Sequence, residues 1–67
     1  MSDPTLAEAM AAARTFQDEM YEELAGLSAT AEATGDYAWY DESAADLRAA
    51  AADHLATVLA AYDRETA

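Results

Sequence analysis

The sequence contains no cysteine, lysine, isoleucine or asparagine, and it has only two glycines and one proline among its 67 residues. Without cysteine, the chain forms no disulfide bond and offers no thiolate for catalysis or for a zinc finger. With so little glycine, it has no glycine-rich phosphate-binding loop. Codons for lysine, isoleucine and asparagine are AT-rich, so their absence indicates a GC-rich prokaryotic or phage genome.

Positive charge is also scarce. Three basic residues stand against fourteen acidic ones, which gives a formal net charge of −11 at pH 7. The charge disfavours direct binding to nucleic acid or to an anionic membrane, because both would repel the chain. It favours basic partners, cations or simple solubility in salt. No hydrophobic run approaches the length of a membrane span, and the first residues lack the basic and apolar parts of a signal peptide. We therefore expect a soluble, cytoplasmic protein that does not bind membranes.

Alanine, by contrast, is abundant: the chain has 20 alanines, and alanine is the strongest helix former. In each half of the chain one set of residues recurs at alternating steps of three and four, the spacing with which one helix packs against another. The first stripe is Leu6, Met10, Ala13, Gln17, Met20, Leu24, Leu27 and Ala31. The second stripe is Tyr37, Tyr40, Ala44, Leu47, Ala51, His54 and Val58. No segment shows the alternation that predicts a strand.

The two stripes come into register if the chain folds back between Gly35, a good helix stop, and Asp36, a good helix cap. We therefore predict a single all-α domain that is an antiparallel two-helix hairpin. Its expected parts within residues 1–67 are a helix over 4–33, a turn over 34–37 and a helix over 38–64.

Ser2 or Asp3 is the expected cap of the first helix, with Pro4 in its first turn. The alternative is a three-helix bundle monomer. In that fold the chain breaks at Gly26, and Ser43 begins a late third helix.

Several large apolar residues fall beside the stripes, near the open end of the hairpin. A patch of this kind on a small chain usually marks an interface, and a second copy would complete an antiparallel four-helix bundle. We therefore expect a homodimer. The predicted self-association residues are Phe16, Leu55, Leu59 and Tyr62.

Polar residues also occur within the stripes. Gln17 is expected to face His54 in a buried polar layer that fixes the register, and Arg48 to pair with Glu23. A metal site in a helical bundle typically uses Glu-x-x-His, but Ala51 stands three residues before His54. We predict no metal ion and no other cofactor.

Acidic residues cluster in the first helix as like charges one turn apart, a spacing that costs a few tenths of a kcal/mol per pair. Tryptophan is enriched in binding hot spots, and the single tryptophan lies off the stripes among acids near the turn. The predicted partner contacts are Asp18, Glu19, Glu22, Glu23, Trp39, Asp41 and Glu42.

No catalytic motif is present, so we predict that the protein is not an enzyme. The favoured function is that of a regulator or inhibitor that docks on a basic protein surface, in its strongest form by mimicking a nucleic-acid backbone. One alternative is a structural or assembly component that acts through its apolar patch. The other is a helical bundle that binds metal through carboxylates and histidine.

Overall fold

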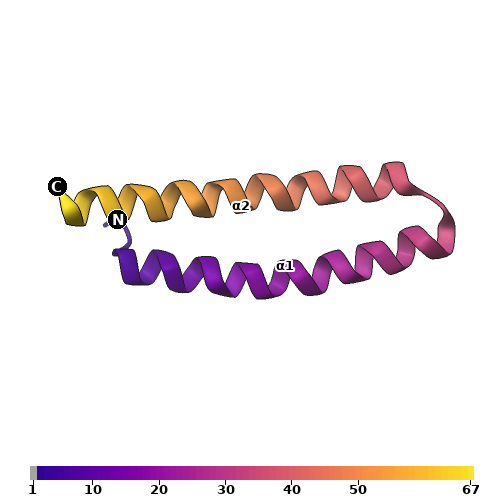
Figure 1. The fold of residues 1–67 in the computed structure, drawn as a ribbon, viewed down its shortest axis with the longest axis horizontal. Helices are drawn as coiled ribbons and strands as arrows, with labels where there is room; N and C mark the ends of the chain where they lie inside the picture. Colours follow the sequence, from indigo (N-terminus) through magenta and orange to yellow (C-terminus); the bar gives the residue numbers. More distant parts are fainter. Residues whose placement is uncertain (1) are drawn as a thin grey trace.

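Two long helices form an antiparallel hairpin in a computed structural model that describes residues 2–67 (Figure 1). Helix α1 spans Leu6–Thr34 and helix α2 spans Tyr37–Thr66. Only Gly35 and Asp36 link them, whereas the sequence suggested a four-residue turn. These residues contain no strand and no third helix, so the predicted hairpin is confirmed and the three-helix alternative is wrong.

The hairpin turn uses the two residues predicted for it. Gly35 ends α1 in the left-handed conformation, with φ of 74°, and its N–H donates to the Ala31 carbonyl at 2.7 Å. Glycine suits this position because it has no Cβ to clash there. Asp36 then caps α2, since its Oδ1 accepts from the Trp39 N–H at 3.0 Å.

The first helix begins at a capping box. The Thr5 hydroxyl accepts from the Glu8 N–H at 3.1 Å, and Glu8 Oε1 accepts from the Thr5 N–H at 3.0 Å. The prediction of Ser2 or Asp3 as the cap is therefore wrong. Thr5 followed three residues later by Glu8 matches the capping-box pattern, which binds two otherwise unpaired N–H groups reciprocally.

The seam between the helices is narrow. Of residues 2–67, only four are buried, and all are alanines: Ala9, Ala31, Ala44 and Ala61. The larger seam residues are only half-buried, and they are Leu6, Phe16, Met20, Leu24, Leu27, Tyr40, Leu47, His54 and Val58. Close approach therefore depends on alanine, and no large side chain is enclosed.

The predicted stripes match this seam with three exceptions. Tyr37 is 60% exposed, and Met10 and Gln17 are also exposed. In α1, Ala9 replaces Met10 in the seam and Phe16 replaces Gln17, each one residue earlier. In α1 the observed and the predicted stripes both run from Leu6 to Ala31 in seven steps, so they differ only in where the steps of three and four fall.

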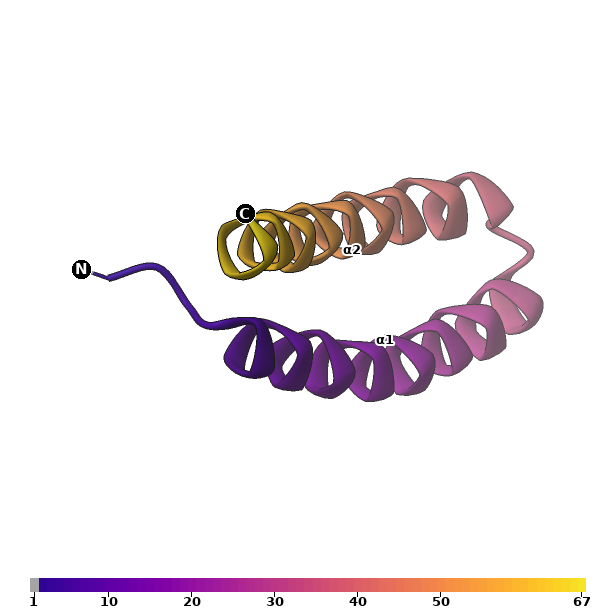
Figure 2. The same cartoon turned by 60° about the vertical axis from the view of Figure 1, so that its left-hand side comes forward.

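The open end of the hairpin, where both termini lie (Figure 2), is held by contacts from the last turn of α2. Glu65 Oε2 accepts from the Leu6 N–H at 3.0 Å, and Arg64 donates to the Pro4 carbonyl at 2.8 Å. Arg64 also forms the only ion pair within residues 2–67, with Asp3 at 3.9 Å. The expected pair between Arg48 and Glu23 is not formed.

The two glycines give a matched test of the hairpin. Gly26 lies inside α1, and a Cβ added there would meet nothing within 4 Å. We expect Gly26→Ala to raise the free energy of unfolding by about 1 kcal/mol, because alanine is the better helix former. Gly35→Ala should lower it by about 1–2 kcal/mol, because φ there is positive. Urea unfolding followed by circular dichroism measures both, and two changes of the same sign would contradict this structure.

The capping box predicts a pH dependence. Hydrogen bonds from the Thr5 backbone N–H and then from its hydroxyl lower the pKa of Glu8 below its ordinary value of 4.5. The folded state therefore favours the ionised carboxylate, so its contribution to stability is full above pH 4.5 and is lost as the pH falls through the lowered pKa.

Glu8→Gln retains an acceptor oxygen but cannot titrate. The stability difference between wild type and this variant should be constant near neutral pH and should shrink below pH 4.5. Urea unfolding across this pH range provides the measurement. Glu22→Gln removes another exposed carboxylate from α1 and serves as the control. The same pH profile for both variants would contradict the role of Glu8.

Candidate interaction surfaces

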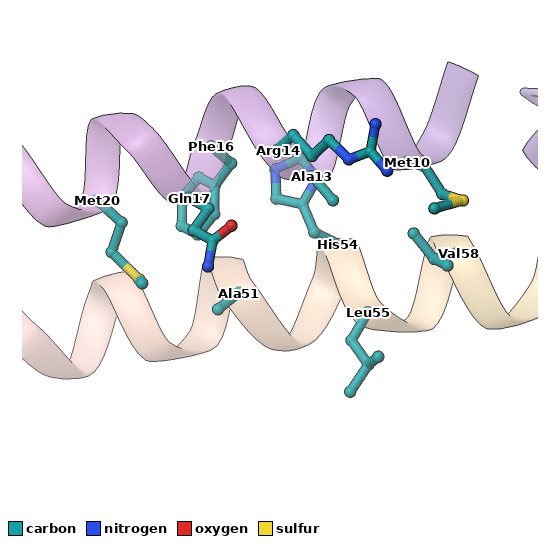
Figure 3. A pocket seen from close by; sticks show the side chains of 10 residues that line it. All are labelled: Met10, Ala13, Arg14, Phe16, Gln17, Met20, Ala51, His54, Leu55 and Val58. Carbon is teal, nitrogen blue, oxygen red and sulfur yellow. The ribbon is translucent and has the colours of Figure 1, made fainter. Parts of the chain in front are cut away.

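An open groove of about 400 Å³ runs along one side of the seam, in the half nearer the open end (Figure 3). Its lining is mainly apolar. The lining residues are Met10, Ala13, Arg14, Phe16, Gln17, Met20, Ala51, His54, Leu55 and Val58. Met10 and Leu55 both line it, so these sides of α1 and α2 face the same way.

An aromatic contact crosses the seam at this groove. The rings of Phe16 and His54 have centroids 4.7 Å apart and an interplanar angle of 30°, and His54 points from α2 toward α1 in Figure 3. Gln17 is exposed, so the predicted polar layer of Gln17 and His54 is wrong. The cause is local: α1 takes a step of three residues after Ala13, which brings Phe16 to the seam instead.

Most of the exposed large apolar side chains share the side of the groove. On α1, Tyr21 follows Met10 by eleven residues, close to three helical turns. On α2, Tyr37 precedes Leu55 by eighteen residues, or five turns. Leu59 and Tyr62 lie one and two turns after Leu55. We call this the apolar face, and its members are Met10, Tyr21, Tyr37, Leu55, Leu59 and Tyr62, with exposed fractions between 38% and 61%.

The apolar face differs from the patch predicted from the sequence. Leu55, Leu59 and Tyr62 are exposed and belong to it, whereas Phe16 is half-buried against His54. Met10, Tyr21 and Tyr37 were not included in the prediction. The eleven- and eighteen-residue spacings are the signals that would have identified them.

The opposite side of the hairpin is acidic. Glu19 follows Met10 by nine residues and Asp46 precedes Leu55 by nine, and nine residues are two and a half turns. These two carboxylates therefore lie across their helices from the apolar face. Trp39, Asp46 and Asp53 follow one another at steps of seven, so they share this side of α2. We call it the acidic face, and its members are Glu19, Glu23, Trp39, Asp46 and Asp53, all of them exposed.

The predicted partner contacts are not all brought together. Glu19, Glu23 and Trp39 lie on the acidic face, and Glu42 lies beside it. Asp18 and Glu22 follow the outer edge of α1, while Asp41 falls on the side of the apolar face near the turn; all four of these acids are exposed. Sequence reasoning missed Asp46 and Asp53, although their seven-residue spacing from Trp39 indicates a shared face.

Charge on the side of the apolar face is nearly balanced. Arg14 lies one turn after Met10, and Arg48 lies two turns before Leu55. The acids on this side are Glu32 and Asp41, both near the turn. Two of the three arginines of the chain therefore lie on this side, while the excess of negative charge lies elsewhere.

Within residues 2–67, no three His, Asp or Glu side chains are placed together so that they could hold a metal ion. Neither helix in this part of the chain is long and apolar enough to cross a membrane. No family model, curated protein or solved structure shows significant similarity to the chain. Function must therefore be inferred from the two faces.

Proposed function

We propose that the protein is a small, non-enzymatic binding module, a regulator or inhibitor whose acidic face docks on a basic surface of another protein. The observation that carries the proposal is the separation of the faces. Glu19, Glu23, Asp46 and Asp53 lie on one side of the hairpin, together with the only tryptophan.

Electrostatics supplies the mechanism. A surface of one charge sign accelerates the encounter with a partner of the opposite sign and repels partners of the same sign. Trp39 is 37% exposed, so it can bury further apolar area when a partner covers it. A row of carboxylates along a helical rod also presents fixed negative charges in a line, which is the basis for mimicry of a nucleic-acid backbone.

A second candidate function is structural, and the apolar face favours it. Six large side chains on one side of a short hairpin form a surface suited to assembly. In this role the chain associates with itself as a homodimer, and the two hairpins build a four-helix bundle. The two functions use opposite sides of the molecule, so they are compatible and can be tested separately.

The acidic face is tested by two substitutions that each remove one negative charge. We expect Glu19→Gln with Asp46→Asn to weaken binding to a basic protein at least about tenfold, which is about 1.4 kcal/mol, and to reduce its salt sensitivity. The wild-type chain is immobilised through its C-terminus and captures proteins at low salt from an extract of a bacterium with a GC-rich genome. Titration of each captured protein with both variants then gives the affinities.

The control variant is Glu32→Gln with Asp63→Asn, which removes the same charge from other parts of the surface. It should retain most of the affinity. Trp39→Ala should weaken binding without changing its salt dependence. Equal affinity of the wild type and the acidic-face variant for every captured protein would refute the proposal.

The apolar face is tested by introducing one negative charge, Leu59→Asp, which assembly would have to bury. If it mediates assembly, light scattering should give twice the chain mass of 7.1 kDa for the wild type and a single chain mass for Leu59→Asp. Ala56→Asp adds the same charge on the outer edge of α2 and should leave the dimer intact. A Leu59→Asp variant that still assembles would contradict the structural role of this face.

A further inference from the structure

We propose that a second copy of the chain covers the apolar face, with the turns of the two hairpins at opposite ends of the pair. This inference rests on the self-association proposed above and extends it. It specifies the relative orientation of the copies and therefore where the two acidic faces point.

The exposed area of the hairpin supports a second copy as the occupant. The chain exposes 4907 Å², whereas a compact monomer of its mass exposes about 4,100 Å². The difference of about 800 Å² is what each partner buries in a standard protein interface. The radius of gyration agrees, since it is 15.2 Å against about 11 Å for a compact chain of this length.

The thin core supports the same occupant. Among the described residues of one copy, nothing larger than alanine is buried. Chains below about 70–80 residues usually need a disulfide, a metal or oligomerisation in addition to their own core. This chain has no cysteine, and residues 2–67 contain no cluster of potential metal ligands. A second copy supplies the missing layer, and a partner identical to the chain is always present at the chain's own concentration.

Charge allows the contact despite the net charge of −11. Arg14 and Arg48 offset Glu32 and Asp41 on the side of the apolar face, so pairing through it keeps the acidic faces apart. Pairing through the acidic face, or through the outer edge of α1 with Asp18 and Glu22, would bring carboxylates of the two copies together.

The position of the charges along the hairpin sets the orientation. Glu32 and Asp41 both lie near the turn, one on each helix. If the turns lay at the same end, a two-fold axis along the hairpin would place α1 over α2 of the other copy. Glu32 of each copy would then face Asp41 of the other, and like charges directly opposite are destabilising.

Opposite ends avoid this repulsion and also fit the apolar side chains. Each helix then crosses its own counterpart antiparallel about a two-fold axis near its midpoint. Tyr21 lies close to the middle of α1, so the two tyrosines approach each other across the axis. Leu59 falls at the level of Ala45 of the other copy, which is exposed, so a large side chain meets a small one there.

The arrangement makes the assembly bivalent. Within each hairpin the acidic face lies opposite the apolar face, so pairing directs the two acidic faces outward on opposite sides. One pair would then bind two basic partners, and the complex would contain two copies of each.

Because the chain has no cysteine, one introduced cysteine per copy gives an unambiguous label. Ala33→Cys carries a spin label on an exposed position next to the turn, away from the apolar face. Pulsed electron paramagnetic resonance then measures the distance between the two labels in the pair. With turns at opposite ends, thirteen residues of rise on each side of the midpoint place the labels about 40 Å apart or more.

A label distance below about 30 Å at Ala33 would place the turns together and overturn the orientation, leaving self-association intact. Asp18→Cys, near the middle of α1 on its outer edge, should give a distance clearly shorter than about 40 Å in either arrangement and verifies that the labelled chains pair. A single chain mass by light scattering at every concentration would overturn both the orientation and self-association. None of these outcomes bears on whether the acidic face binds a basic protein, since that is measured separately.

Discussion

The rest of the structure depends on the close approach of two helices across alanine. Ala9 and Ala61 are buried toward one end of the seam, and Ala31 and Ala44 toward the other. A methyl side chain fills little space, so the helix axes can come near each other and the turn can be made with only two residues. The same closeness leaves no room for large side chains between the helices. Phe16, Met20 and Leu47 therefore lie partly at the margins of the seam, and the core cannot grow thicker within one copy.

Large apolar side chains and acidic side chains then lie on opposite sides of the hairpin. Residues nine apart on either helix lie across it from each other, which is how Met10 and Glu19, or Leu55 and Asp46, come to opposite faces. This two-sided pattern differs from that of an ordinary amphipathic helix, whose apolar stripe faces the core alone. Here each helix has one stripe toward its neighbour, in which alanines are buried and larger side chains are half-buried, a second apolar stripe, and an acidic side. With these three surfaces on each helix, the apolar face stays exposed after the hairpin has folded.

Much of the hairpin could be predicted from the sequence, because its strongest signals are local. Gly35 and Asp36 act through backbone conformation and one side-chain hydrogen bond, and both act as expected. The register within α1 could not be fixed by pattern alone. Ala9 and Met10 are both apolar, and only the packing of the two helices decides that the smaller one is buried. The acidic face was only partly recognised, since runs of neighbouring acids attract notice while Asp46 and Asp53 are isolated in the sequence.

The contacts at the open end have a mechanical consequence. The chain enters α1 and leaves α2 at the same end of a rod 49 Å long, where Arg64 and Glu65 join the two termini. A force that pulls the termini apart acts across the seam, so it loads these contacts first and then separates the layers one at a time. Such unzipping needs far less force than sliding two helices past each other. Under tension the hairpin would open progressively from its ends and close again from the turn.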